Sequence, residues 1–169
     1  MSLNRRNVLF GGTAIAALGA AALFLRPMAS STATAAEGTF EVTMTEEEWR
    51  TKLPADVFEV LRHESTERPG SSPLLYEHRA GIFNCAGCAL PLFDSATKYE
   101  SGTGWPSFYQ PLDKAVGETS DSSLGMVRTE VHCSRCGGHL GHVFNDGPQP
   151  TGLRYCMNGL ALTFTPTAA

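Results

Sequence analysis

The spacing of hydrophobic positions separates a short helical segment from a longer β region. From about residue 81 onward the apolar runs are short and are punctuated by Gly, Pro, Asn and Asp, which is typical of strands joined by tight turns. In one of them, Val127, Thr129 and Val131 alternate with polar residues, which favours a strand with one buried face. We therefore expect strands at residues 81–84, 126–132, 139–144, 153–158 and 161–165.

Two short helices are predicted before these strands. Thr45 and Glu48 have the spacing of a capping box, with Thr45 as the N-cap, and Met44 and Trp49 are placed to form a hydrophobic staple. Pro54 suits the first turn of a second helix, whose apolar stripe would be Val57, Val60 and Leu61. Residues 65–73 are rich in Ser, Pro and Gly and are predicted to form a loop. The chain is therefore expected to be mainly β with a short helical start.

The first 35 residues have the composition of an export signal. Arg5 and Arg6 are followed by an uncharged apolar stretch over residues 8–25, and residues 33–35 read Ala-Thr-Ala, a small-residue cleavage site. The adjacent arginines are typical of a twin-arginine signal, although Asn4 stands where Ser or Thr is usual. We expect cleavage and a periplasmic or exported protein. Retention of the stretch as a membrane anchor is the alternative.

Length and charge restrict what the remainder can be. The chain has 169 residues, which allows one domain, here expected at residues 36–169. The net charge is −4 for the whole chain and −7 without the first 35 residues, which argues against a nucleic-acid partner. The five cysteines are an odd number, so they cannot all form internal disulfides.

Four of the cysteines form two C-x-x-C pairs, Cys85 with Cys88 and Cys133 with Cys136. Each pair can supply two thiolates to one tetrahedral ion, and a glycine in or after each pair permits a tight turn. Two such pairs in a small domain indicate a structural zinc site. Two disulfides or a redox-active pair are the alternatives, because an exported protein meets an oxidising compartment.

The fifth cysteine, Cys156, is a candidate nucleophile. In a strand, Arg154, Cys156 and Asn158 would share one face, and a fixed cation beside a cysteine favours the reactive thiolate. Asn158 could position a substrate or a water, while Tyr155 and Met157 would face the core. A buried structural cysteine is the alternative, but the polar neighbours on this face argue against it.

Two further segments carry candidate chemistry. His139 and His142 could transfer protons or bind metal, but both reach one site only if the strand bends, which Gly141 would permit. The segment at residues 101–108 is Gly-rich and lacks the lysine of a phosphate-binding loop. Its Trp105 could form the apolar wall of a pocket or could belong to the core.

Taken together, these segments resemble the methionine-R-sulfoxide reductase family. The resemblance is carried by both C-x-x-C pairs, residues 101–108, the Gly-His-Leu-Gly-His-Val-Phe-Asn-Asp-Gly-Pro run at 138–148, and the Arg-Tyr-Cys-Met-Asn run at 154–158. It covers about residues 45–164. The resemblance implies a compact fold of two small antiparallel sheets with structural zinc. We also expect a monomer whose only membrane contact would be an uncleaved signal.

The resemblance also implies residue roles. Cys156 would attack the sulfur of methionine-R-sulfoxide in peptides and proteins, His142 would protonate the sulfoxide oxygen, and His139 would support the site. Asn158 would orient the substrate, Arg154 would favour the thiolate, and Trp105 and Phe108 would contact the substrate. The expected products are methionine and a sulfenic acid on Cys156.

One position departs from the family pattern. Many members carry a resolving cysteine where this chain has Thr103, and the other four cysteines are assigned to zinc. We therefore expect no internal disulfide and direct reduction by an external thiol, such as a thioredoxin-like protein. Two rival hypotheses remain open at this point: a cysteine hydrolase using Cys156, His142 and Asn158, and a zinc-stabilised peptide-binding module.

Overall fold

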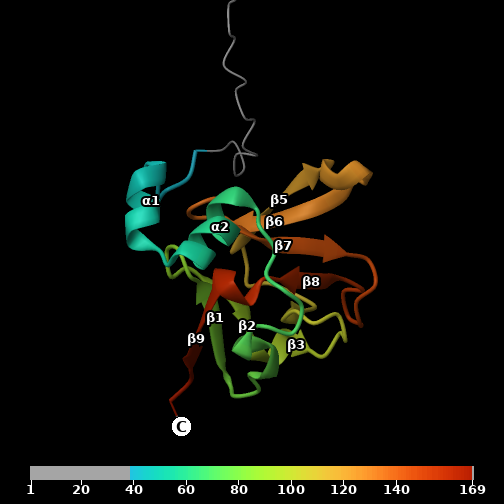
Figure 1. Cartoon of the computed structure of the whole chain (residues 1–169). Helices are drawn as coiled ribbons and strands as arrows, with labels where there is room; N and C mark the ends of the chain where they lie inside the picture. The colour runs from blue at the N-terminus through green and yellow to red at the C-terminus, as the bar shows by residue number, and fades with distance from the viewer. Residues whose placement is uncertain (1–38, 169) are drawn as a thin grey trace, which may run out of the picture. The chain divides into compact units, whose positions relative to one another are not determined.

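A computed structural model of the chain describes residues 39–168, which form two short helices and two antiparallel sheets (Figure 1). The predicted fold class, mainly β with short N-terminal helices, is confirmed. The predicted export signal at residues 1–35 lies outside the described residues. Within residues 39–168, no helix combines the length and the apolar content needed to cross a membrane.

The helices begin where the sequence predicts. Helix α1 (Glu46–Lys52) has the capping box: the Thr45 hydroxyl accepts from the backbone N–H of Glu48, whose carboxylate accepts from the Thr45 N–H at 2.7 Å. Helix α2 (Ala55–His63) starts after Pro54, which occupies the N-cap. Its buried face consists of Phe58, Val60 and Leu61, whereas the predicted Val57 is only partly buried against the core.

The smaller sheet has three strands, in the order β2 (Pro91–Asp94), β1 (Gly81–Cys85) and β9 (Leu162–Pro166). Strands β1 and β9 lie far apart in the sequence and pair antiparallel along their whole length, from Gly81 with Pro166 to Cys85 with Leu162. The C-terminal end of the fold is thereby fixed to its middle, and Cys85 is placed at the end of a central strand.

The larger sheet has six strands, all antiparallel, in the order β3-β4-β8-β7-β6-β5. Strand β8 (Arg154–Met157) lies between β4 (Ser107–Phe108) and β7 (His139–Phe144), and β6 (Arg128–Cys133) lies beyond β7. The edges are β3 (Lys98–Tyr99) and β5 (Val116–Asp121). Cys156 therefore lies in a central strand of this sheet.

The prediction of one exposed face along residues 126–132 is wrong. Val127, expected inside, is 80% exposed, while Glu130 and His132, expected outside, are 5% and 8% exposed. The strand begins only at Arg128, and both of its faces are covered further along: Val131 belongs to the hydrophobic core, and Glu130 is bonded to a buried histidine.

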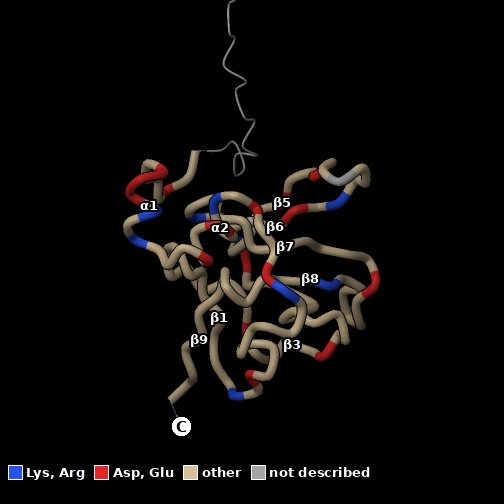
Figure 2. Tube along the Cα trace, in the orientation of Figure 1, with Lys and Arg blue, Asp and Glu red and all other residues tan. Residues whose placement is uncertain are grey.

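Aromatic side chains from both sheets fill the core between them. Phe83 of β1, Phe93 of β2 and Phe108 of β4 are completely buried, and the rings of Phe93 and Phe108 are stacked with centroids 4.3 Å apart. Charged residues of both signs are spread along the described part of the trace (Figure 2). The core thus fixes β4, and with it the neighbouring strand β8 that carries Cys156.

Candidate active site and metal centre

The four cysteines of the C-x-x-C pairs meet at one point. Cys85 ends β1 and Cys133 ends β6, with Cys88 and Cys136 in the turns that follow. All four sulfur atoms lie within 4.8 Å of one another, with 3.7 Å between Cys85 and Cys136 and 3.5 Å between Cys88 and Cys133. Four thiolates about 2.3 Å from a zinc ion would be separated by about 3.8 Å. The cluster therefore has the dimensions needed to hold a metal ion.

The electrostatics of the cluster also fit a cation. Hydrogen bonds within the cluster, first with Cys133 and then with Cys136, raise the pKa of Cys85, and burial adds to this effect. The same neighbours hydrogen-bond Cys88 and lower its pKa. A divalent ion would stabilise all four thiolates at once, whereas without it the group holds only part of that charge. All five cysteines of the chain are unpaired.

A second site surrounds Cys156. A pocket of about 130 Å³ opens over the large sheet and is lined by Thr66, Trp105, Arg128, Gly141, His142, Phe144, Cys156 and Asn158. Cys156 is half-buried and pairs across the strands with Ser107 of β4 and His142 of β7. Of the predicted residues, the structure thus brings Cys156, His142, Asn158 and Trp105 together in one pocket.

A bulge in β7 aligns the two histidines. His139 pairs with His132 and Gly141 with Val131, so Leu140 is an extra residue in β7. Because of it, the rings of His139 and His142 lie on the same side, with centroids 5.4 Å apart. Gly141 follows the bulge residue with a φ of 158°, and it also serves the close approach of β7 to β8, since a Cβ at this position would collide with the Cys156 carbonyl oxygen.

The imidazole of His142 is held by a carboxylate. Its Nε2 lies 2.8 Å from Asp121 Oδ2, and the same oxygen accepts from Arg128 Nη2 at 2.6 Å. Burial lowers the pKa of His142, and the bond to Asp121 opposes that shift. Burial likewise works against ionisation of Asp121, but hydrogen bonds from Ser123, His142 and Arg128 keep its pKa well below the usual range. Asp121 is therefore a carboxylate that orients the His142 ring.

His139 does not line the pocket. It is 1% exposed, and its Nδ1 lies 2.8 Å from the buried carboxylate of Glu130. Its Nε2 is buried and has no hydrogen-bond partner among the described residues. His139 packs behind His142, which agrees with a supporting position and not with direct contact to a bound molecule.

Arg154 and Asn158 lie on either side of Cys156, as the strand period predicts. Arg154 is bound by two 2.8 Å hydrogen bonds to Asp146, and its guanidinium lies 4.3 Å from the centroid of the Phe144 ring. The bond to Asp146 raises the pKa of Arg154, and burial opposes this effect. The Asn158 amide accepts from the Glu67 N–H at 3.0 Å and donates to the Leu140 carbonyl at 3.2 Å.

The two aromatic candidates differ in position. Trp105 lines the pocket, and its indole N–H donates to the Glu67 carbonyl at 3.1 Å. Phe108 is completely buried, stacks on Phe93 and does not reach the pocket, so the expected substrate contact at Phe108 does not fit the structure. The reason is the strand period: Phe108 follows Ser107, which faces Cys156, and therefore points to the opposite side.

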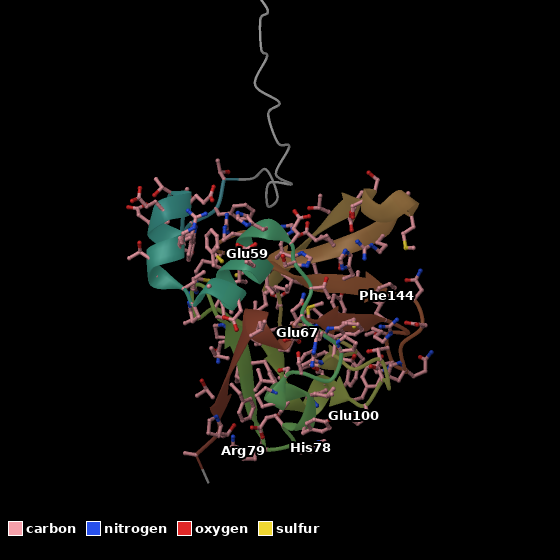
Figure 3. All side chains as sticks on the ribbon, viewed as in Figure 1. Glu59, Glu67, His78, Arg79, Glu100 and Phe144 are labelled. Carbon is pink, nitrogen blue, oxygen red and sulfur yellow. The ribbon has the colours of Figure 1, made fainter. Side chains whose placement is uncertain are left out.

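Several residues of this site were missed by the sequence reasoning. Asp121 binds His142 and Arg128, and Glu130 binds His139. Glu67, which Figure 3 labels together with Phe144, accepts a hydrogen bond from Trp105 and so anchors the loop that closes the pocket. The Glu67 carboxylate accepts from the backbone N–H groups of Gly159 and Leu160, and its burial raises its pKa despite those bonds. Only Glu130 carried a signal, as an acid in a strand next to a cysteine pair.

The described residues thus combine a mainly β fold and a four-cysteine cluster with a separate, half-buried thiol beside a histidine. The SelR domain matches residues 53–166. Peptide methionine sulfoxide reductase MsrB of Pseudomonas putida (strain W619) is 54% identical over 127 residues, which is 75% of this chain and 96% of that protein. The MsrB of Leptospira interrogans is 52% identical over 126 residues, 74% of this chain and 96% of its own length. The chain belongs to the methionine-R-sulfoxide reductase family.

Proposed function

We propose that this chain, a peptide methionine sulfoxide reductase by its family, reduces the R epimer of methionine sulfoxide through Cys156. The observation that carries the proposal is the pocket in which the Cys156 thiol and the His142 imidazole are cross-strand neighbours beneath Trp105. Family membership favours this reaction over the hydrolase and binding-module hypotheses. Moreover, His142 is bonded to Asp121 and Asn158 to main-chain groups, which does not suit a Cys-His-Asn relay.

In the proposed reaction, the Cys156 thiolate attacks the sulfoxide sulfur while His142 protonates the sulfoxide oxygen. The attack forms a transient S–S bond between Cys156 and the substrate sulfur, and the protonated sulfoxide oxygen leaves as water when the S–O bond breaks. Water then adds to the Cys156 sulfur and loses a proton, while the S–S bond breaks and its electron pair stays with the substrate sulfur. The substrate sulfur gains two electrons and the Cys156 sulfur loses two, which gives methionine and a Cys156 sulfenic acid. Trp105 forms the apolar wall for the substrate methyl group, and Arg154 supplies positive charge beside the thiolate.

Regeneration of the enzyme requires two thiols from outside the chain. One thiol condenses with the sulfenic acid to form a mixed disulfide and release water, and a second thiol displaces Cys156 from it. Thr103 Oγ1 lies 3.7 Å from the Cys156 sulfur, so a hydroxyl stands where an internal resolving thiol would be needed. We expect a thioredoxin-like protein to be the physiological partner.

The metal and the location belong to the same proposal. The sulfur-only donor set and its spacing suit Zn²⁺, which would stabilise the fold, since four protein ligands leave no open position for catalysis. The arginine pair and small-residue site before residue 36 favour export to the periplasm, with the mature domain acting there as a monomer.

A direct test uses separated R and S epimers of an N-acetylated methionine sulfoxide peptide with dithiothreitol as reductant. We expect turnover of the R epimer, and a loss of at least about 1,000-fold in Cys156→Ser, because the nucleophile is removed. Turnover of the S epimer alone, or unchanged activity in Cys156→Ser, would contradict the proposal. Acyl-enzyme formation with an ester substrate would instead favour the hydrolase.

A further inference from the structure

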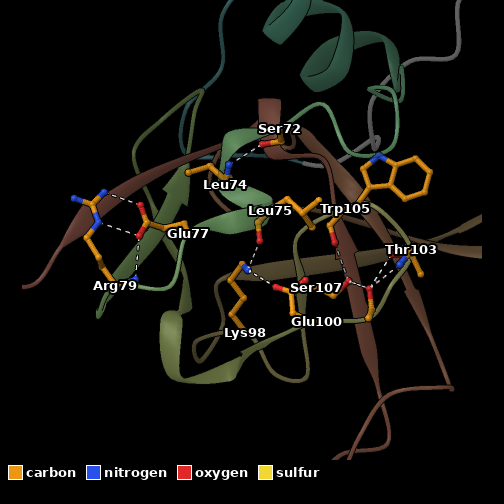
Figure 4. Close-up of polar contacts among 11 residues, drawn as sticks. Ser72, Leu74, Leu75, Glu77, Arg79, Lys98, Glu100, Thr103, Trp105 and Ser107 are labelled. Atoms are coloured by element: carbon orange, nitrogen blue, oxygen red, sulfur yellow. Dashed lines mark hydrogen bonds and ion pairs between the residues drawn. The ribbon is translucent and has the colours of Figure 1, made fainter.

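A chain of three hydroxyl groups leads to the sulfur of Cys156. Ser107 Oγ lies 3.1 Å from the Trp105 carbonyl oxygen and 2.7 Å from Ser101 Oγ. Ser101 Oγ lies 2.8 Å from Thr103 Oγ1, which in turn lies 3.7 Å from Cys156 Sγ. Figure 4 shows the start of this chain at Trp105, Ser107 and Thr103. Ser107 is completely buried, so bulk water does not compete for its hydrogen bonds.

Counting protons fixes the direction of every bond in this chain. A carbonyl oxygen only accepts, so Ser107 must donate its single proton to Trp105. Ser101 must then donate to Ser107, and Thr103 to Ser101, because each hydroxyl carries one proton. The only proton left for the last contact belongs to the thiol. The arrangement with all four bonds formed therefore requires the neutral Cys156 thiol as donor to Thr103.

Loss of the thiol proton must reverse the chain. A thiolate only accepts, so Thr103 has to turn its proton toward the sulfur. Ser101 and Ser107 then turn theirs toward Thr103 and Ser101 if the two contacts between the hydroxyls are to stay hydrogen-bonded. The hydroxyl hydrogens rotate while the oxygens stay in place. The Trp105 carbonyl loses its donor, but the bond from Thr103 to a charged sulfur is stronger than the neutral bond it replaces.

We propose that Thr103 is the residue that donates a hydrogen bond to the Cys156 thiolate, and that Ser101 and Ser107 form a reversible hydroxyl relay behind it. This inference rests on the proposed function, in which Cys156 is the nucleophile. Thr103 stands where many family members carry a resolving cysteine, and the proposal gives this position a role of its own. Its hydroxyl stabilises the attacking Cys156 thiolate, whereas a resolving cysteine would trap the Cys156 sulfenic acid.

The test measures the reactivity of Cys156 in the absence of substrate. Iodoacetamide alkylates the thiolate, and mass spectrometry of the peptide containing Cys156 separates it from the four clustered cysteines. Thr103→Val keeps the side-chain shape but removes the hydroxyl. We expect alkylation near neutral pH to slow about tenfold, as for the loss of a charge-assisted hydrogen bond, with the rising limb of the pH–rate profile displaced to higher pH.

Thr103→Ser restores a hydroxyl and should alkylate within about twofold of the unmodified protein, since the hydroxyl itself is retained. Thr163→Val, at an exposed position of β9, is the matched control and should change nothing. If Thr103→Val misfolds by circular dichroism, Thr103→Ala carries the same expectation. An unchanged alkylation rate and pH profile in the folded variant overturns the relay.

Ser107→Ala distinguishes the relay from simple packing. It removes the hydroxyl that ties Ser101 to the Trp105 carbonyl, so Ser101 and Thr103 can turn their protons toward Cys156 more easily. We expect faster alkylation, the opposite sign to Thr103→Val, whereas equal slowing in both variants would contradict the proposal. R-epimer turnover is measured in parallel: its absence from the unmodified protein rejects the proposed function, while alkylation still reports on the relay.

Discussion

At the scale of single residues, Cys156 and His142 each contact a partner side chain that can be changed without removing the two groups themselves. Asp121 orients the His142 ring, and Thr103 is the hydroxyl nearest to the sulfur in the described hydrogen bonds. Both partners come from segments distant in sequence, β5 and the loop before β4. Substitutions at these partners therefore test the chemistry without removing the reacting groups.

Thr103→Cys should convert the enzyme to an internal disulfide mechanism. A thiol at this position would lie close to Cys156, because the Thr103 hydroxyl is already 3.7 Å from its sulfur. After one turnover without reductant, we expect a disulfide between the introduced thiol and Cys156 in the variant, and no internal disulfide in the unmodified protein. Peptide mass spectrometry reads both states. A disulfide from Cys156 to a cluster cysteine in the unmodified protein would refute direct external recycling.

Asp121→Asn should change the pH dependence of turnover. His142 must be protonated to act as an acid, so activity falls as pH rises through its pKa, which burial already lowers. The Asp121 bond opposes that lowering, and its loss moves the fall in kcat to lower pH. We expect about a tenfold loss at about pH 8, which shrinks only as the pH falls below the lowered pKa of His142.

The control for this variant is Asp113→Asn, an exposed aspartate outside the pocket, which should keep the original profile. A kcat profile for Asp121→Asn that is lowered equally at every pH would mean that Asp121 has only a structural role.

At the scale of elements, the pocket is held by the loop between α2 and the first 3-10 turn. The Glu67 carboxylate binds two N–H groups of the segment after β8, and the Glu67 main chain bonds Trp105 and Asn158. One residue thus connects the pocket wall, the residue after the Cys156 strand and the turn that leads into β9. This loop was predicted only as a loop, because a single glutamate in it gives no periodic signal.

Glu67→Gln should loosen this connection. A carboxamide can accept from only one of the two N–H groups, which leaves a buried donor unpaired and costs about 1–3 kcal/mol. Urea unfolding should show that loss of stability, and the KM for the R-sulfoxide peptide should rise with Trp105 less firmly placed. Glu47→Gln, on the exposed surface of α1, is the matched control and should alter neither quantity.

The elements that the sequence predicts are those with a local physical signal. The capping box at Thr45 and the strand at residues 139–144 were found because a cap and a short apolar run bounded by turn residues are local signals. Strand β5 was missed because it lies at an edge of the sheet and shows no hydrophobic alternation. Strands β3 and β4 were missed because each has only two residues, too few to show a periodicity. The bulge at Leu140, which places both histidines on one side, arises from pairing between strands and could not be read locally.

At the scale of the whole molecule, the cysteine cluster joins the two sheets. Cys85 belongs to the three-stranded sheet and Cys133 to the six-stranded sheet, and their sulfurs converge with those of the two turns. The spacing of the cysteine pairs predicted this convergence, because paired C-x-x-C turns have one dominant structural use. Cys85, Cys133 and Cys136 belong to the same buried cluster as Phe83, Phe93 and Phe108, so an ion held by the cysteines would lie against that core.

Removing the metal should therefore destabilise the whole domain and not only the cluster. Structural zinc sites contribute about 10–16 kcal/mol of apparent binding energy in small domains, and each 1 kcal/mol shifts the midpoint by about 4 °C or more. We expect a strong chelator to lower the melting temperature by at least about 20 °C, with one equivalent of zinc released, measured by calorimetry and by atomic absorption. Cys156→Ser, outside the cluster, should hold the same amount of zinc and lose the same stability on chelation. The opposite outcome is a purified protein that contains no metal, has its four cluster cysteines joined as disulfides, and has a melting temperature that chelator does not change. That outcome would show that covalent bonds join the sheets instead of an ion.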